Sequence, residues 1–181
     1  TPLQTIGESG QWQAQLHRPD GSDFEVLFEG VSQGRVQWEL TGNHNVANAL
    51  AAIAAARHVG VLPEQAVVAL PEFRNVKRRM ELLAERDGVR LYDDFAHHPT
   101  AIASTLEGLR HQVGDEQIVA VIEPRSNSMR LGAHREGLAP STAAADQVIW
   151  FGPDNLGWDL AAAVQDAPVP TQVLNDADAI V

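Results

Sequence analysis

The chain has 181 residues, of which 44% are hydrophobic, a formal net charge of −11 and no cysteine. This length and apolar content suffice for one domain with its own core, or for one domain and part of another. The negative charge and the absence of lysine or arginine blocks argue against nucleic-acid partners. No apolar run is long enough to span a membrane, and without cysteine no disulfide can form. We therefore expect a cytoplasmic protein.

The first forty residues alternate apolar and polar side chains around turn-forming residues, which predicts a small antiparallel meander. From Gly42 the apolar period becomes that of a helix, and an alanine-rich run continues to Gly60, a residue suited to ending a helix. Pro63 begins a second, shorter helix. The predicted elements of this half are strands over 11–17, 24–28 and 36–40 and helices over 43–59 and 63–70.

Beyond residue 71 strands and helices alternate, which predicts an α/β fold with a mostly parallel, doubly wound sheet. We therefore place a domain boundary between residues 71 and 72. Residues 175–181 look like the start of a helix with no helix after it, so we expect a chain cut at both ends. The predicted elements are strands over 89–95, 117–123, 147–151 and 171–174 and helices over 99–111, 134–145 and 160–165.

The first candidate site lies at the start of the 43–59 helix. His44 and Asn48 are four residues apart and share one face of that helix. A helix N-terminus offers free N–H groups and a positive dipole end, and an asparagine amide can both donate to and accept from an adenine edge. The alternative is that Asn43 only caps the helix and the other polar residues cap or face water.

The second candidate site is the segment Asp93-Asp94-Phe95-Ala96-His97-His98-Pro99, where a predicted strand ends and a helix begins. In doubly wound sheets ligands bind at this carboxyl edge. Asp94 can accept hydrogen bonds from ribose hydroxyls, and His97 can donate to a phosphate. Two carboxylates and two imidazoles also suit a metal, but neither an HxH nor an HExxH spacing is present, so we predict no metal site.

The third candidate is Val76-Lys77-Arg78-Arg79-Met80, a short cationic cluster in an acidic protein, just past the proposed boundary. Guanidinium groups bind phosphoryl oxygens and neutralise the charge that develops during transfer. The alternative is a basic turn exposed to solvent.

The fourth candidate is the loop EPRSNSMRLG, residues 123–132, which follows a predicted strand. Arg125 and Arg130 are suited to bidentate capture of carboxylates, and Ser126 with Asn127 can orient an amine or a peptide group. A plain polar loop is the alternative.

Read in order, GNHNVANALAAIAAA, NVKRRME, YDDFAHHPTAI and EPRSNSMRLG resemble the motifs of the Mur ligase family, over about residues 11–165. Members of this family have an N-terminal domain for a UDP-sugar, a central ATPase domain and a C-terminal Rossmann-like domain that brings the incoming amine. The resemblance implies that residues 1–71 are the end of the central domain and that residues 72–181 are most of the C-terminal domain.

The resemblance also implies an activity: ATP-dependent attachment of the recycled murein tripeptide L-alanyl-γ-D-glutamyl-meso-diaminopimelate to UDP-N-acetylmuramate through an acyl phosphate. EPRSNSMRLG favours the tripeptide, whereas the His-His-Pro-Thr segment is shared with alanine-adding members. Alanine ligation, folate polyglutamation and a binding module without catalysis stay open as alternatives.

ATP and Mg²⁺ are the cofactors that the resemblance implies. The sequence contains no GxxxxGK[ST] loop, and the carbamylated lysine and magnesium ligands expected upstream of such a loop are missing too. We therefore expect the fragment alone to be inactive and its metal ligands to lie in the N-terminal and central regions of the same protein.

Each candidate residue receives a role from the resemblance. The implied catalytic residues are Arg79, near the γ-phosphate, and His97, near the phosphates. The implied nucleotide contacts are His44, Asn45 and Asn48 at adenine and Asp94 at the ribose. The implied peptide contacts are Arg125 at a carboxylate, with Ser126, Asn127 and Arg130 beside it. Domain closure would then bring these residues to a single cleft.

Overall fold

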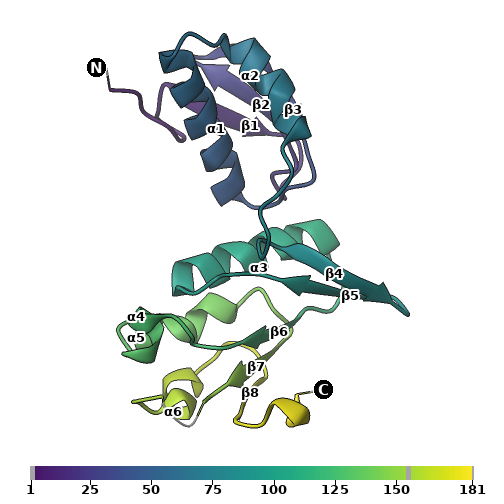
Figure 1. Cartoon of the computed structure of the whole chain (residues 1–181), viewed down its shortest axis with the longest axis vertical. Coiled ribbons are helices and arrows are strands. Elements are labelled where there is room, and N and C mark those ends of the chain that lie inside the picture. The colour runs from purple at the N-terminus through teal and green to yellow at the C-terminus, as the bar shows by residue number, and fades with distance from the viewer. Residues whose placement is uncertain (1–2, 154–155, 181) are drawn as a thin grey trace. The chain divides into compact units, whose positions relative to one another are not determined.

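The computed structural model describes residues 3–153 and 156–180, and its contacts divide the chain into two compact units, Thr1–Lys77 and Arg78–Val181 (Figure 1). Each unit has its own hydrophobic core. The division lies shortly after the boundary predicted at residues 71 and 72. In the described ranges no helix combines the length and apolar character needed to cross a membrane.

The first unit contains the predicted antiparallel meander. Its strands pair in the order β1 (Trp12–Leu16), β2 (Asp23–Phe28) and β3 (Val31–Gln37). The predicted third strand, 36–40, begins too late. Glu29 and Gly30 both have positive φ, 50° and 80°, and form a two-residue hairpin turn, so β3 starts directly after it.

The two predicted helices are present, and they pack on this meander (Figure 1). They are α1 (Asn43–His58) and α2 (Pro63–Ala69), and a 3₁₀ turn, η1 (Leu70–Glu72), follows. Gly60 has φ 97° just past the end of α1, in the region that glycine adopts without a steric penalty. Apolar residues from all five long elements share one core: Trp12, Phe24, Val26, Val36, Val46, Ala49, Leu50, Ile53, Ala54 and Val67.

An ion pair between a buried carboxylate and a half-exposed guanidinium joins β2 to β3. Asp23 is only 6% exposed and accepts hydrogen bonds from Arg35 Nε at 2.6 Å, from Arg35 Nη2 and from Gln37 Nε2 at 2.9 Å. The bidentate Arg35 guanidinium lowers the pKa of Asp23 far below its ordinary value, although burial of the carboxylate works in the opposite direction. The charged form of Asp23 is therefore favoured by the fold.

This lowered pKa predicts a loss of stability in acid. The contribution of Asp23 is complete above the ordinary aspartate pKa of about 4 and is lost as the pH falls through the lower native value. Asp23→Asn removes the charge, so the variant should be less stable than wild type at pH 7 and should lose less stability on acidification. Thermal unfolding midpoints between pH 2 and 7 measure both effects. Asp87→Asn, at a side chain 88% exposed, is the control, and equal acid sensitivity in wild type and Asp23→Asn would contradict the prediction.

The second unit contains a hairpin and a parallel sheet (Figure 1). The parallel strands are β6 (Val119–Ile122), β7 (Gln147–Phe151) and β8 (Thr171–Leu174), in that order, which confirms the α/β class. The hairpin consists of β4 (Glu81–Arg86) and β5 (Val89–Asp93).

The hairpin corrects the prediction for residues 89–95. That segment was expected in the parallel sheet, whereas β5 pairs antiparallel with β4, a strand that was not predicted. Asp87 and Gly88 have positive φ, 52° and 81°, and form the two-residue turn that connects the strands.

The helices of this unit agree with prediction except in one region. α3 (Pro99–Val113) and α6 (Leu160–Val164) lie where expected. The helix predicted over 134–145 is wrong, because that range forms one short helix and a 3₁₀ turn instead, and a further short helix that was not predicted precedes it. In chain order these are α4 (Asn127–Arg130), α5 (Arg135–Leu138) and η2 (Pro140–Thr142). Pro140 has no N–H to donate to α5, so that helix ends at Leu138.

The end of the chain begins a helical turn, as its sequence indicates. Asp176 Oδ1 accepts the N–H of Asp178 at 3.0 Å and caps the 3₁₀ turn η3 (Ala177–Ala179). The last residue of the predicted 175–181 segment lies outside the described residues.

Candidate functional site

The N-terminus of α1 carries the candidate residues of the first unit. Its N-cap is Gly42, which has φ 92° and makes no side-chain cap hydrogen bond. The alternative that Asn43 caps this helix is therefore wrong, since Asn43 is its first helical residue. The side chain of Asn45 donates to the Thr41 carbonyl at 2.8 Å, while His44 and Asn48 are exposed. The structure thus leaves His44 and Asn48 at the surface, one helical turn apart.

A buried turn between β1 and β2 fixes the start of α1. The carbonyl of Asp20, a residue 2% exposed, accepts the N–H of Gly42 at 2.7 Å. A Cβ on Gly21 would lie 3.0 Å from a methyl group of Val46, so only glycine lets the turn come this close to the helix. Trp38 Nε1 donates to the Gly21 carbonyl at 3.0 Å. Packing from outside the helix therefore holds a helix end that has no side-chain cap of its own.

In the second unit, Asp94 holds the loop between β5 and α3 together. Its Oδ2 accepts the N–H of Met80 at 2.9 Å, and its Oδ1 accepts the N–H of Ala96 at 2.7 Å and the hydroxyl of Thr105 at 3.5 Å. A carboxylate offers about four acceptor positions. A ribose hydroxyl, the predicted ligand of Asp94, would share the carboxylate with these internal donors.

The cationic segment lies beside this loop. Arg78 Nε is 3.2 Å from Asp93 Oδ2, and the guanidinium carbons of Arg78 and Arg79 lie 5.4 and 5.8 Å from the centre of the Phe95 ring. Arg78 and Met80 have φ of 61° and 49°, a left-handed conformation that costs about 1–2 kcal/mol per residue. The structure therefore brings the predicted segments 76–80 and 93–99 together, with the backbone on both sides of Arg79 in a strained conformation.

Two neighbouring histidines have different surroundings. His97 is exposed, and its Nδ1 is 2.9 Å from the Phe95 carbonyl, so this nitrogen carries a proton. Its Nε2 can donate to a phosphate only when the ring is doubly protonated. Nδ1 of His98 accepts the N–H of Thr100 at 3.2 Å and caps α3, and its ring contacts the His134 ring at 4.2 Å between centroids. His98 therefore supports the fold, and His97 faces solvent.

The loop before α4 lies against the same segment. Ser126 Oγ donates to the His97 carbonyl at 3.2 Å and accepts the N–H of Met129 at 3.3 Å, so it caps α4 and joins the two loops. Pro124 and Met129 are buried and anchor the loop. The other candidates, Arg125, Asn127 and Arg130, are exposed. The predicted segments 93–99 and 123–132 are therefore neighbours within this unit.

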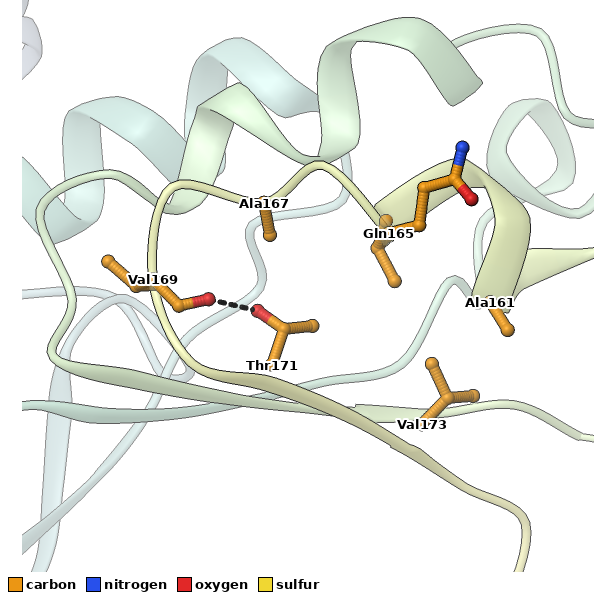
Figure 2. A pocket seen from close by; sticks show the side chains of 7 residues that line it. Ala161, Gln165, Ala167, Val169, Thr171 and Val173 are labelled. Carbon is orange, nitrogen blue, oxygen red and sulfur yellow. Dashed lines mark hydrogen bonds between the residues drawn. The ribbon is translucent and has the colours of Figure 1, made fainter.

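Within the described residues, these loops gather no set of metal ligands and do not line the groove found in the second unit. Among the described residues, no three His, Asp or Glu side chains gather where they could hold a metal ion. A groove of about 350 Å³ lies between α6 and β8, and five of its seven lining residues are apolar, with Gln165 and Thr171 as the polar ones (Figure 2). None of the predicted site residues lines this groove.

Sequence reasoning missed the residues that support the site. The indole of Trp38 reaches a carbonyl 17 positions away, and that of Trp158 reaches carbonyls 28 and 29 positions away. No local spacing signals such contacts, because they arise only when distant segments pack.

The internal hydrogen bonds of Asp94 predict a stability effect. In Asp94→Asn the amide nitrogen cannot accept, so the N–H of Met80 or of Ala96 loses its partner, which should cost about 1–3 kcal/mol in urea unfolding. Asp93→Asn is the matched control, since the exposed pair with Arg78 should contribute less than about 1 kcal/mol. Equal losses in the two variants would contradict the bonding described above.

Known proteins share sequence with nearly all of this chain. Residues 78–181, which form the second unit, match the family described as "Mur ligase, glutamate ligase domain". The chain is 48% identical, over 97% of its length, to the UDP-N-acetylmuramate–L-alanyl-γ-D-glutamyl-meso-2,6-diaminoheptandioate ligase of Escherichia coli K12. It is 45% identical, over 87% of its length, to the ligase of the same name from Haemophilus influenzae.

A solved structure shows the same relationship. The murein peptide ligase of Psychrobacter arcticus superimposes with a TM-score of 0.67 and 43% identity over 95% of this chain. The chain spans only 38% of the Escherichia coli ligase, 35% of the Haemophilus influenzae ligase and 38% of the Psychrobacter arcticus chain.

Proposed function

Because this chain belongs to the Mur ligase family, we propose that it is part of an enzyme that uses ATP to attach L-alanyl-γ-D-glutamyl-meso-diaminopimelate to UDP-N-acetylmuramate. The observation that carries the proposal is the identity to ligases with this substrate name, which extends over nearly the whole chain. We further propose that residues 1–71 end the central ATP-binding domain and that residues 72–181 belong to the C-terminal domain. The enzyme would act in the cytoplasm, where ATP is supplied.

In this proposal the first unit contacts the adenine of ATP. His44 and Asn48 are exposed one turn apart at the start of α1, and Asn45 lies beside them. The amide of Asn48 can donate and accept at once, as an adenine edge requires. The amide of Asn45 already donates to the Thr41 carbonyl, so Asn45 would act by holding this end of the helix.

The second unit would act on the ribose and phosphates. Asp94 would accept a ribose hydroxyl, and Arg79 and protonated His97 would neutralise phosphoryl charge. Phosphoryl transfer depends mainly on positioning and charge neutralisation, which the clustering of Arg79, Phe95 and His97 supports. Mg²⁺ would supply further neutralisation, with ligands outside this chain.

The loop before α4 would receive the incoming peptide. Arg125, two residues before α4, and Arg130, its last residue, are both exposed, and each can bind a carboxylate in bidentate fashion. Asn127 would orient the peptide, and Ser126 would hold the loop through its bond to the His97 carbonyl. Attack of the peptide amine on the acyl phosphate then forms the amide bond and releases phosphate.

The test is a ligation assay with the full-length protein that contains this chain. ADP release and the UDP-linked product are measured with UDP-N-acetylmuramate, ATP and either the tripeptide or L-alanine as the amine. We expect product with the tripeptide and little with L-alanine. Preference for L-alanine would instead assign the protein to the alanine-adding ligases, and nucleotide binding without ADP release would indicate a non-catalytic module.

A further inference from the structure

Of the two proposed peptide-binding arginines, Arg130 lies on α4 and Arg125 lies in the loop just before it. α4 consists of four residues, Asn127–Arg130, and helices this short are unstable in isolation because nucleation is costly. Ser126 caps its N-terminal end. At its C-terminal end the N–H of Gly132 bonds to the Met129 carbonyl at 2.9 Å, and a carbonyl at a helix end can accept a further donor from elsewhere in the fold.

Trp158 supplies a further donor at that end. Its Nε1 lies 3.0 Å from the Met129 carbonyl and 3.1 Å from the Arg130 carbonyl. One indole N–H is therefore shared between the last two carbonyls of α4. The contact joins segments that lie far apart in the sequence.

The indole ring also packs against the chain where α4 ends. Gly132 has φ 68°, and a Cβ there would lie 3.0 Å from Trp158 Cδ1 and 3.1 Å from Arg135 Cδ. Trp158 is half-buried and packs on the core of the second unit. Its neighbour Asp159 caps α6 by accepting the N–H of Ala162 at 3.0 Å. The indole thus connects the end of α4 to the start of a second helix.

We propose that Trp158 is a positioning residue for peptide recognition, one that fixes the end of α4 and so the spacing of Arg125 and Arg130. The inference rests on the proposed function. It applies to a substrate with at least two carboxylates, because two separated guanidinium groups bind such a peptide well only when their spacing is fixed. Trp158 itself would not touch the peptide.

Trp158→Phe in the full-length protein tests this role, since it keeps an aromatic ring and removes the N–H. The Michaelis constant for the tripeptide should rise about threefold to tenfold, while kcat and the Michaelis constant for ATP stay within about twofold of wild type. Amide hydrogen exchange should become faster in residues 130–132 and stay unchanged in β7.

Trp38→Phe is the matched control, because Trp38 also donates its indole N–H to a backbone carbonyl but lies in the first unit. It should leave hydrogen exchange in residues 130–132 and the Michaelis constant for the tripeptide unchanged.

The outcomes separate this inference from the proposed function. If the wild type is active and Trp158→Phe leaves the Michaelis constant for the tripeptide unchanged, the role of Trp158 is overturned and the proposed function stands. A wild type that ligates no tripeptide would overturn the proposed function and, with it, peptide positioning. Unchanged exchange in residues 130–132 would show in either case that Trp158 does not hold α4.

Discussion

Replacing Arg79 with alanine in the full-length protein is expected to lower kcat by about 10²–10³-fold, the usual effect of removing one group that stabilises transition-state charge. The guanidinium of Arg79 lies 5.8 Å from the Phe95 ring, in a segment that Asp94 ties to the β5–α3 loop through the N–H of Met80. Its position is therefore set by the fold of the second unit. Steady-state ADP release at saturating substrates measures the effect.

Two further variants distinguish lost chemistry from lost structure. Arg79→Lys keeps the charge but not the planar fork, so it should retain part of the activity. Arg86→Ala removes an arginine of the same unit whose side chain is 90% exposed and pairs with its neighbour Asp87, so kcat should stay within about twofold of wild type. Wild-type turnover in Arg79→Ala would refute the phosphate role.

The predictable parts of the fold are those where burial imposes a period. α1 buries Val46, Leu50 and Ile53 along one side, and this spacing alone predicts its position. The parallel strands β6, β7 and β8 were also predicted, since short apolar runs separated by helices leave few other arrangements. In these elements the local pattern and the tertiary packing agree.

The missed parts have local causes. The Asp87-Gly88 pair is a strong hairpin signal, but Leu82 and Leu83 are consecutive apolar residues at a β-bulge, so β4 lacks the alternation of a regular strand. In the range 134–145, predicted as one helix, the apolar residues on both sides of Pro140 are spaced as in a helix. Pro140 nevertheless ends α5 within that range.

The candidate site was predictable as a set of loops but not as a set of contacts. The four motifs could be read from residue types, whereas the bond from Ser126 to the His97 carbonyl joins residues 29 positions apart. The internal donors to Asp94 likewise come from Met80 and Thr105, which only the folded chain brings near. The proposed roles of these side chains remain predictions for the experiments described above.

Arg125→Ala is expected to raise the Michaelis constant for the tripeptide about 10- to 100-fold, as loss of hydrogen bonds between charged groups does, with the constant for ATP nearly unchanged. The Arg125 side chain is exposed, while its neighbour Pro124 is buried, so the substitution removes a binding group and leaves the loop anchored. Arg125→Lys should recover only part of the affinity, because an ammonium cannot form the two parallel bonds of a guanidinium. Initial rates at varied tripeptide and at varied ATP measure the two constants. Equal increases in both would mean that Arg125 supports the catalytic arrangement as a whole and does not recognise the peptide.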